Sequence, residues 1–304
     1  MNPTDKKMEI TVVVLTYNEE KNITACLESV YNFFKEIFIV DSGSTDKTLE
    51  IAKKYTNKIY SHPFDNYSKQ RNWAFENLPI ETDWILNLDA DHRIMPELAM
   101  ELKSVFTKEI PDDINGFLIS RRTMFMGKWI KHGGHYPTYH ANLFRKGFGK
   151  CEEKLYDQHY LVEGKLLKLE GDIIDIITDS LTNFTTRHNK WSTMEAIYQL
   201  SGKHKKEIDI VKADLKGHAI ERRRALKKFY EKFPLFIRPF FYFFQRYFLR
   251  LGFLDGKEGL VFHFLQGFWF RFLIDAKIFE IKYFSRKKKK TIPEVIKEHY
   301  GIEV

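Results

Sequence analysis

Apolar runs alternate with helical segments through the first third of the chain. The continuous β-branched run from Ile10 to Leu15 is typical of a strand buried on both faces. Similar runs recur, each followed by an amphipathic segment, and this alternation predicts an α/β fold with a doubly wound, mostly parallel sheet. The strands are expected at residues 10–15, 36–40, 57–63 and 83–90, and the helices at 20–34, 46–55, 67–78 and after Pro96.

The pattern changes after about residue 115. Residues 116–130 and 139–147 are predicted as longer strands or a hairpin, and residues 159–171 as a hairpin that turns at Glu163 and Gly164. From about residue 179 helical patterns dominate. We therefore expect a catalytic α/β domain at residues 8–195 and a helical region at residues 196–304.

Composition adds a second boundary signal. Of the 27 phenylalanines in 304 residues, 16 lie between Phe229 and Phe284. The formal net charge of +8 permits an anionic membrane, a phosphorylated ligand or nucleic acid as a partner. Two isolated cysteines, Cys26 and Cys151, imply no disulfide framework, and the N-terminus shows no apolar signal segment, so cytosolic chemistry is expected.

Polar residues follow three of the predicted strands at the point where each strand ends. In an open α/β sheet, ligands bind beyond the carboxyl ends of the strands. Asp89 and Asp91 are two apart in an extended segment, so their carboxylates share one face and repel unless a cation lies between them. A hard divalent cation, Mg²⁺ or Mn²⁺, satisfies that need, and the small Ala90 allows close approach of a ligand.

Four segments together resemble glycosyltransferase family 2, over roughly residues 9–195. They are VVVLTYNEE, IVDSGSTDKT, QRNWA and NLDADHRI. The resemblance implies the GT-A fold and a nucleotide-sugar donor, with a UDP-sugar expected. It implies that Asp41 recognises the nucleobase and that Asp91 is the more direct metal ligand, with Asp89 beside it. The remaining implied nucleotide-sugar contacts are Thr16, Tyr17, Glu19, Arg71, Asp89 and Ala90.

Transfer to a hydroxyl needs a base, which relatives supply well after the Asp-x-Asp motif. We favour Asp157, because YDQH resembles a subgroup of the bacterial enzymes, with Glu153 and then Glu152 as alternatives. The segment TRHNKWS is loosely similar to a motif of processive relatives. We expect its His188, Asn189 and Trp191 to close the site near the diphosphate or acceptor, although a helix start that packs on Trp191 fits the pattern equally.

The aromatic C-terminal region is expected to lie in a membrane interface without crossing the membrane. Arginines and prolines interrupt its apolar runs, and a helix from Pro239 would place Arg246 and Arg250 on one face among aromatic residues. The next predicted helix has a polar stripe at steps of four, formed by His263, Gly267, Arg271 and Asp275. This spacing would let Arg271 pair with Asp275. The basic run 286–290 favours an anionic leaflet. A helical core or a dimer interface is the alternative.

The sequence thus predicts a metal-dependent, inverting glycosyltransferase at the cytoplasmic face of the inner membrane. It would move a sugar from a nucleotide-sugar to a lipid-linked or glycan acceptor in cell-surface polysaccharide synthesis, and no nucleic-acid partner is expected. One alternative is a polyprenyl-phosphate sugar synthase, whose ionised acceptor needs no base. Another is a non-catalytic protein that binds a membrane or nucleic acid through the basic tail.

Overall fold

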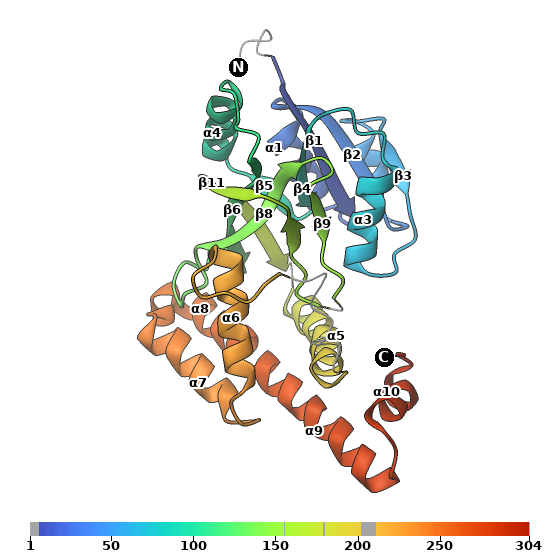
Figure 1. Ribbon diagram of the computed structural model, residues 1–304, viewed down its shortest axis with the longest axis vertical. Helices are drawn as coiled ribbons and strands as arrows, with labels where there is room; N and C mark the ends of the chain where they lie inside the picture. Colours follow the sequence, from blue (N-terminus) through green and yellow to red (C-terminus); the bar gives the residue numbers. More distant parts are fainter. Residues whose placement is uncertain (1–5, 155, 179, 202–210, 304) are drawn as a thin grey trace. The chain divides into compact units, whose positions relative to one another are not determined.

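The computed structural model describes residues 6–154, 156–178, 180–201 and 211–303 (Figure 1). The chain forms two compact units, each built from several segments. The first unit consists of Met1–Thr123, Pro137–Glu153 and Gln158–Ile176, and the second of Met124–Tyr136, Lys154–Asp157 and Ile177–Val304. The expected boundary at residue 195 stays a prediction, while the structure groups residues 177–195 with the second unit.

The first unit is built on a sheet with a parallel half and an antiparallel half. Within the described residues the strand order is β3-β2-β1-β4-β8-β6-β11-β5, and the pairs among β3, β2, β1 and β4 are parallel. The predicted α/β class is therefore confirmed. The parallel strands are β1 (Met8–Thr16), β2 (Phe34–Asp41), β3 (Ile59–Ser61) and β4 (Trp84–Asp89).

The antiparallel half contains the strands that the sequence places after residue 115. β8 pairs with β4 and β6, which confirms the predicted pairing of residues 116–130 with 139–147. The predicted hairpin at Glu163 and Gly164 is wrong, because β10 pairs with β9 while β11 joins the main sheet beside β5. The antiparallel half consists of β6 (Ile114–Phe125), β8 (Thr138–Arg145) and β11 (Lys165–Thr178) with the earlier short strand β5 (His92–Ile94), and β9 (Gly149–Cys151) and β10 (Tyr160–Val162) form a separate two-stranded sheet.

Helices cover both faces of the parallel strands, because side chains alternate along each strand. Val12 and Val14 pack with α1 (Ile23–Tyr31), α2 (Thr48–Ala52) and α4 (Pro96–Phe106) in one cluster of buried side chains. Val13 and Leu15 point the other way and pack with α3 (Tyr67–Asn77). Burial on both faces explains the unbroken apolar run in β1.

The second unit is mainly helical. A short strand β7 (Lys128–Trp129) pairs with the end of β6, and the helices pack through several small apolar clusters. None of the described helices is both long enough and apolar enough to cross a membrane. The helices are α5 (Leu181–Leu200), α6 (Ala219–Glu231), α7 (Arg238–Phe244), η3 (Gln245–Leu249), η4 (Gly252–Asp255), α8 (Gly256–Phe262), η5 (His263–Trp269), α9 (Phe270–Lys288) and α10 (Ile292–Tyr300).

Two π-helical segments change the helix faces that the sequence predicts. η3 and η5 are wound with i→i+5 hydrogen bonds, so steps of four no longer keep residues on one face. Arg246 is buried while Arg250 is exposed, yet both contact the turn of Gly133 and Gly134, so the expectation that they lie on one face stays a prediction. The expected pair of Arg271 with Asp275 is wrong, because Asp275 binds the buried Arg238 at 2.5 Å.

Candidate functional site

The polar ends of the parallel strands lie side by side in the first unit. The register pairs Thr16 with Asp41 across β1 and β2, and Leu15 with Asp89 across β1 and β4. The backbone N–H of Ala90 then donates to the carbonyl of Leu15 at 3.0 Å, which continues the pairing past the last strand residue. Because parallel strands end at the same edge, local sequence order was enough to bring these residues together.

Asp41 organises the loop that follows β2. Its carboxylate accepts hydrogen bonds from the backbone N–H groups of Gly43 and Ser44, both at 2.9 Å, and from the Ser44 hydroxyl at 2.5 Å. Gly43 has φ +94°, a conformation that a side chain would strain. Asp41 is buried with 2% exposed, so its recognition of a nucleobase, which stays a prediction, would occur from within this turn.

The loop after β1 is bound to the same turn. Asn18 adopts a left-handed φ of 52°, and its side-chain oxygen accepts from the backbone N–H of Thr45 at 2.8 Å. The N–H of Glu19 donates to the Thr48 hydroxyl at 2.8 Å. Tyr17 is 57% exposed, and the buried Thr16 hydroxyl lacks a hydrogen-bond partner in the described structure. The contacts of these two side chains with a nucleotide-sugar stay predictions.

Asp89 is held by a buried arginine. Arg71, from α3, is fully buried and donates to Asp89 Oδ1 at 2.6 Å, to the carbonyls of Leu88 and Val13, and to the Tyr67 hydroxyl. Burial alone would raise the pKa of Asp89, but the Arg71 guanidinium, with His92 and Arg121, holds it below its usual value. Most of the Arg71 donors are therefore used within the protein, and its expected contact with a nucleotide stays a prediction.

His92 links the Asp-x-Asp motif to a third carboxylate. Its Nδ1 accepts from the backbone N–H of Asp89 at 3.0 Å, so the neutral ring carries its proton on Nε2. That nitrogen lies 3.7, 3.9 and 4.0 Å from carboxylate oxygens of Asp89, Asp91 and Asp175. Burial, reinforced by Arg121, lowers the pKa of His92 to about 4. A neutral His92 thus points an N–H donor at the three carboxylates.

The donor set fits a hard divalent cation bound by carboxylates. Ligand atoms of Asp89, Asp91 and His92 lie within 4.8 Å of one another. Since the neutral His92 presents a protonated Nε2, the carboxylates are the better ligands, and oxygen ligands suit Mg²⁺ or Mn²⁺. Arg71 already occupies Oδ1 of Asp89, which fits the expectation that Asp91 is the more direct ligand.

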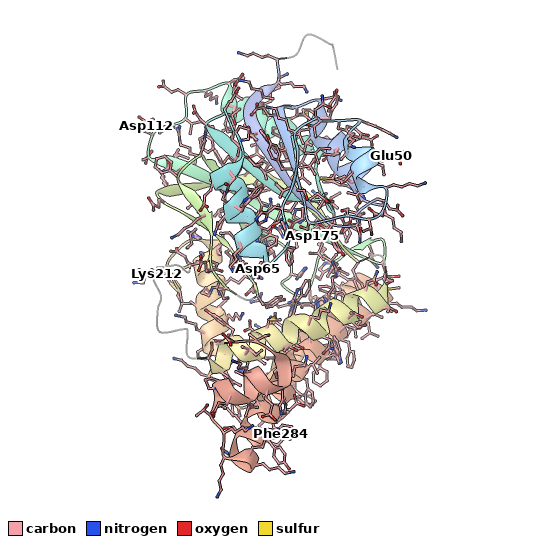
Figure 2. The ribbon with its side chains drawn as sticks, turned by 90° about the vertical axis from the view of Figure 1, so that its right-hand side faces the viewer. Glu50, Asp65, Asp112, Asp175, Lys212 and Phe284 are labelled. Carbon is pink, nitrogen blue, oxygen red and sulfur yellow. The ribbon has the colours of Figure 1, made fainter. Side chains whose placement is uncertain are left out.

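Asp175 and Arg121 were not identified from the sequence. They lie on the antiparallel strands β11 and β6, where Arg121 Nη1 is 3.7 Å from Asp175 Oδ2, and Asp175 pairs in register with His92. Figure 2 shows Asp175 at the end of the first unit that is away from Asp112. Neither residue sits in a motif, and only the arrangement of strands brings them to the Asp-x-Asp motif.

The favoured base, Asp157, belongs to the second unit and is ion-paired there. Lys227 lies 3.1 Å from Asp157 and 3.0 Å from the buried Glu195, and Arg223 is 3.5 Å from Asp157. Asp157 has a left-handed φ of 58°. The role of Asp157 as a base stays a prediction.

The alternatives to Asp157 lie in the first unit. Glu152 is buried, and its carboxylate accepts from the backbone N–H of His159 at 2.9 Å. Glu153, the next residue, is exposed. Burial and a backbone partner suit Glu152 to a structural role, which leaves Glu153 as the more accessible alternative.

The TRHNKWS segment forms part of α5 in the second unit. His188 is buried against Phe184, with ring centres 3.8 Å apart, and its Nδ1 lies 2.8 Å from the Phe184 carbonyl. Asn189 Oδ1 accepts from Lys277 at 2.7 Å, and Trp191 packs on Tyr156. Burial lowers the pKa of His188 to about 4. These contacts fit the helix-packing alternative, and a contact with the diphosphate or acceptor stays a prediction.

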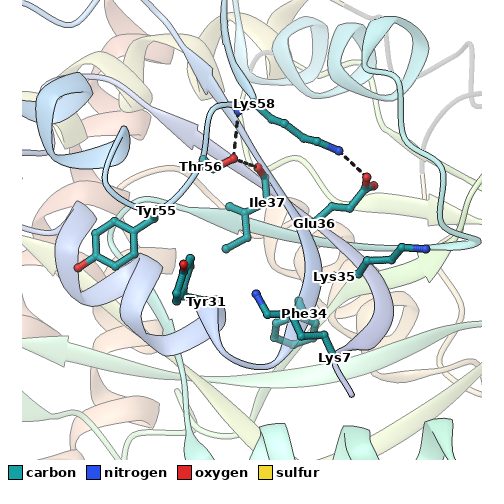
Figure 3. Close-up of a pocket in the computed structure, with 9 residues that line it drawn as sticks. All are labelled: Lys7, Tyr31, Phe34, Lys35, Glu36, Ile37, Tyr55, Thr56 and Lys58. Atoms are coloured by element: carbon teal, nitrogen blue, oxygen red, sulfur yellow. Dashed lines mark hydrogen bonds and ion pairs between the residues drawn. The ribbon is translucent and has the colours of Figure 1, made fainter. Parts of the chain in front are cut away.

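A small hollow in the first unit lies away from this site (Figure 3). It adjoins the start of β2, whereas the Asp-x-Asp motif follows the end of β4. Its lysines already have partners: Lys58 binds Glu36, Lys35 binds Glu9, and Lys7 lies over Tyr31. The hollow is lined by Lys7, Tyr31, Phe34, Lys35, Glu36, Ile37, Tyr55, Thr56 and Lys58.

Acidic residues at the ends of parallel strands place a ligand site at this edge of the sheet. Comparison with known proteins indicates the class of enzyme. Residues 11–157 match the family described as glycosyl transferase family 2. An uncharacterized glycosyltransferase of Rickettsia conorii is 27% identical, over 95% of this chain and 95% of its own. The lipopolysaccharide core biosynthesis glycosyltransferase LpsC of Rhizobium meliloti is 26% identical, over 90% of this chain and 93% of its own.

The protein is a glycosyltransferase with a family 2 domain at residues 11–157. Among solved structures, that of S. aureus TarS 1-349 in complex with UDP aligns with 93% of this chain and 92% of its own, at 19% identity and a TM-score of 0.41. The family 2 domain sets aside the non-catalytic alternative.

Proposed function

We propose that this glycosyltransferase is metal-dependent and inverting, and that it moves a sugar from a UDP-sugar to a lipid-linked glycan in cell-surface polysaccharide synthesis. The observation that carries the proposal is the Asp-x-Asp pair at the end of β4, beside the polar ends of β1 and β2. Asp89 is held by Arg71, and Asp91 lies within reach of the same cation.

The residues of the first unit account for donor binding in this proposal. Asp91, with Asp89, would hold Mg²⁺ or Mn²⁺, which supplies positive charge against the departing diphosphate. Tyr17 and Thr16 lie at the nucleoside end, and Asp41 shapes the adjoining loop through its bonds to Gly43 and Ser44. His92 faces the carboxylates with its Nε2 N–H at 3.7 to 4.0 Å, and it stays neutral because it is buried.

The acceptor hydroxyl must lose a proton as it attacks the anomeric carbon, and Asp157 is proposed to take it. The ion pairs with Lys227 and Arg223 hold the carboxylate in place. Proton uptake by Asp157 would weaken those pairs, and Glu195 remains as a partner for Lys227. Attack opposite the departing nucleotide inverts the anomeric centre, which the family resemblance implies.

A lipid-linked acceptor and attachment to the cytoplasmic face of the inner membrane are proposed from the second unit. Its helices α7 and η3 and the turn after them expose large apolar side chains, which are 47% to 68% accessible, and a basic run follows at residues 286–290. Apolar burial and attraction to anionic lipid act together in interfacial binding. The relative named for lipopolysaccharide core biosynthesis supports such an acceptor. The exposed side chains are Phe240, Phe241, Phe244, Phe248, Leu249 and Leu251.

A thermal-shift screen of nucleotide-sugars, with and without Mn²⁺, tests the proposal. We expect one donor, a UDP-sugar, to raise the Tm only when Mn²⁺ is present, because the cation joins the diphosphate to Asp91. The exposed carboxylate Glu97 provides a matched control, since Glu97→Gln should keep the shift and Asp91→Asn should lose it. A Tm that no donor changes, with or without metal, would contradict the proposal.

A further inference from the structure

Two arginines of the second unit flank one tyrosine ring. Tyr242 belongs to α7, Arg246 to η3 and Arg271 to α9. The guanidinium carbons of Arg246 and Arg271 lie 5.4 and 5.1 Å from the centre of the Tyr242 ring, and Arg246 Nη1 donates to its hydroxyl at 2.9 Å. Two like charges on one ring repel each other unless a negative group lies near both.

Neither arginine is matched by a carboxylate among the described residues. Arg246 is 6% exposed; its Nε donates to the Gly133 carbonyl at 2.8 Å, and its Nη2 has neither solvent contact nor a hydrogen-bond partner in the described structure. Arg271 lies over the rings of Tyr230, Tyr242 and Phe270, and its Nε is buried without a hydrogen-bond partner in the described structure. The negative charge of Glu195 acts on Arg271 without a direct ion pair. Buried donors of this kind are costly to leave unpaired.

Three buried carboxylates of the same unit already have basic partners. Asp275 binds Arg238 at 2.5 Å, and Glu195 binds Lys227 at 3.0 Å. Asp255 accepts from His132, with Oδ1 2.6 Å from Nδ1. The positive charge of Arg246 and Arg271 is therefore available to a negative group from outside the chain.

The ionisation of neighbouring groups reports the same positive potential. Burial alone would raise the pKa of Tyr242, yet Arg246 and Arg271 lower it to about 7. The pKa of His135 falls well below its usual value, first because it is buried and then because Arg246 and Arg223 lie near. A second hydroxyl, that of Tyr230, is buried and lacks a partner in the described structure, so it adds a donor.

We infer that Arg246, Arg271 and the Tyr230 hydroxyl form an anion-binding site that takes a phosphate group, as a monoester or a diphosphate. Arginine presents paired N–H donors that match phosphate oxygens, and the surrounding rings shield the charges from water. A dianion offsets both guanidinium charges, which a single carboxylate does not. The phosphate is either part of a membrane lipid or part of a soluble compound, and this inference does not depend on the proposed sugar transfer.

Calorimetric titration of the whole protein with inorganic phosphate, at constant ionic strength in NaCl, tests the site. We expect saturable binding to the wild type and at least a tenfold weaker affinity in Arg271→Gln. Arg271 donates no hydrogen bond to the described protein, so this variant should keep its fold. Arg222→Gln removes an exposed arginine from α6 and is the matched control, with unchanged affinity expected.

Flotation with vesicles separates the two sources of phosphate. If the source is a lipid, vesicles with phosphatidic acid should bind the wild type better than vesicles with phosphatidylglycerol, and Arg271→Gln should lose that preference. Equal binding to both vesicles, with inorganic phosphate still bound through Arg271, assigns a soluble phosphate compound. Both results support the site.

Three results would overturn the inference. The wild type could bind no phosphate, or Arg271→Gln could bind phosphate as tightly as the wild type. The third result is an absorbance of ionised tyrosine at pH 8 that Tyr242→Phe removes and that phosphate does not change, because ionised Tyr242 would then be the counter-charge of the two arginines. The Mn²⁺-dependent Tm shift with a UDP-sugar is also measured on Arg271→Gln. This shift tests the proposed function, and phosphate binding tests the anion site, so either one can fail without the other.

Discussion

Arg71 of the first unit and the pair Arg246 and Arg271 of the second unit differ in how their charges are satisfied. In the first unit Arg71 donates to Asp89, to two carbonyls and to the Tyr67 hydroxyl. In the second unit Arg246 and Arg271 flank Tyr242 without a carboxylate partner among the described residues. Burial alone therefore does not indicate what an arginine does. A matched arginine positions a carboxylate, whereas an unmatched pair supplies charge for a ligand.

Substitution of Asp157 should have the largest effect. It tests whether an ion-paired carboxylate of the second unit acts as the catalytic base. If Asp157 is the base, Asp157→Asn should lower sugar transfer by about 10²- to 10⁴-fold and leave donor binding unchanged. Initial rates and the Mn²⁺-dependent Tm shift measure the two properties. Glu153→Gln should stay within about twofold of the wild-type rate on the same reasoning. Unchanged transfer by Asp157→Asn would favour a phosphate acceptor, as in a polyprenyl-phosphate sugar synthase.

Arg71, which is paired with a carboxylate, and Arg271, which is not, should differ in their contribution to the free energy of unfolding. Arg71→Met leaves the Asp89 charge without its partner and should lower the free energy of unfolding by about 3–5 kcal/mol. Arg271→Gln removes an unpaired charge along with its ring contacts, and the change should stay within about 1 kcal/mol. Urea unfolding followed by tryptophan fluorescence measures both. Equal losses in the two variants would remove the distinction between them.

Asp91 of the Asp-x-Asp motif should be required for sugar transfer, because it is proposed to bind the metal in the first unit. Asp91→Asn should reduce sugar transfer by about 100-fold, which corresponds to about 2.7 kcal/mol in the barrier, because the metal loses a ligand. Rates at saturating Mn²⁺ are the measurement, and Glu97→Gln should retain wild-type rates. An Asp91→Asn enzyme with normal metal-dependent turnover would show that Asp89 alone suffices.

His188, one of the buried histidines of the second unit, should make stability depend on pH. His188 has a pKa of about 4 in the folded protein, below its ordinary value of 6.5, so the unfolded chain takes up the proton first as the pH falls. The stabilisation is complete above pH 6.5 and is lost toward pH 4. From pH 7 to pH 5 the wild type should lose about 2 kcal/mol more than His188→Asn.

Urea unfolding at the two pH values measures this difference. The exposed His299 supplies the control, because His299→Asn should follow the wild type. Identical pH dependence in His188→Asn and the wild type would show that His188 is accessible to protons in the folded state.

Much of the candidate site follows from local sequence. The unbroken apolar run of β1 and the polar residues after it predict a buried parallel strand with a site at its end, and the register confirms that Thr16, Asp41 and Asp89 lie along one edge. The spacing of Asp89 and Asp91 needs only the geometry of an extended segment. These features depend on neighbours in sequence or on consecutive parallel strands.

The charge partners of these residues could not be predicted in the same way. Asp175 reaches His92 because β11 pairs antiparallel with β5, although more than eighty residues separate the two in sequence. Arg71 is in a family motif, yet only burial under the strand ends shows that it binds Asp89. In the helical region, steps of four predicted a pair of Arg271 with Asp275, but Arg238 from another helix binds Asp275 instead.

The sequence by itself determined the α/β class, the resemblance to family 2 and the acidic strand end, because periodicity and short motifs are local. The tertiary structure alone decided which charges are matched, Asp89 with Arg71 and Asp157 with Lys227, and which are not, Arg246 and Arg271 at one tyrosine ring. Electrostatic partners are set by distance in space and by burial, and neither quantity is written in the spacing of residues along a chain.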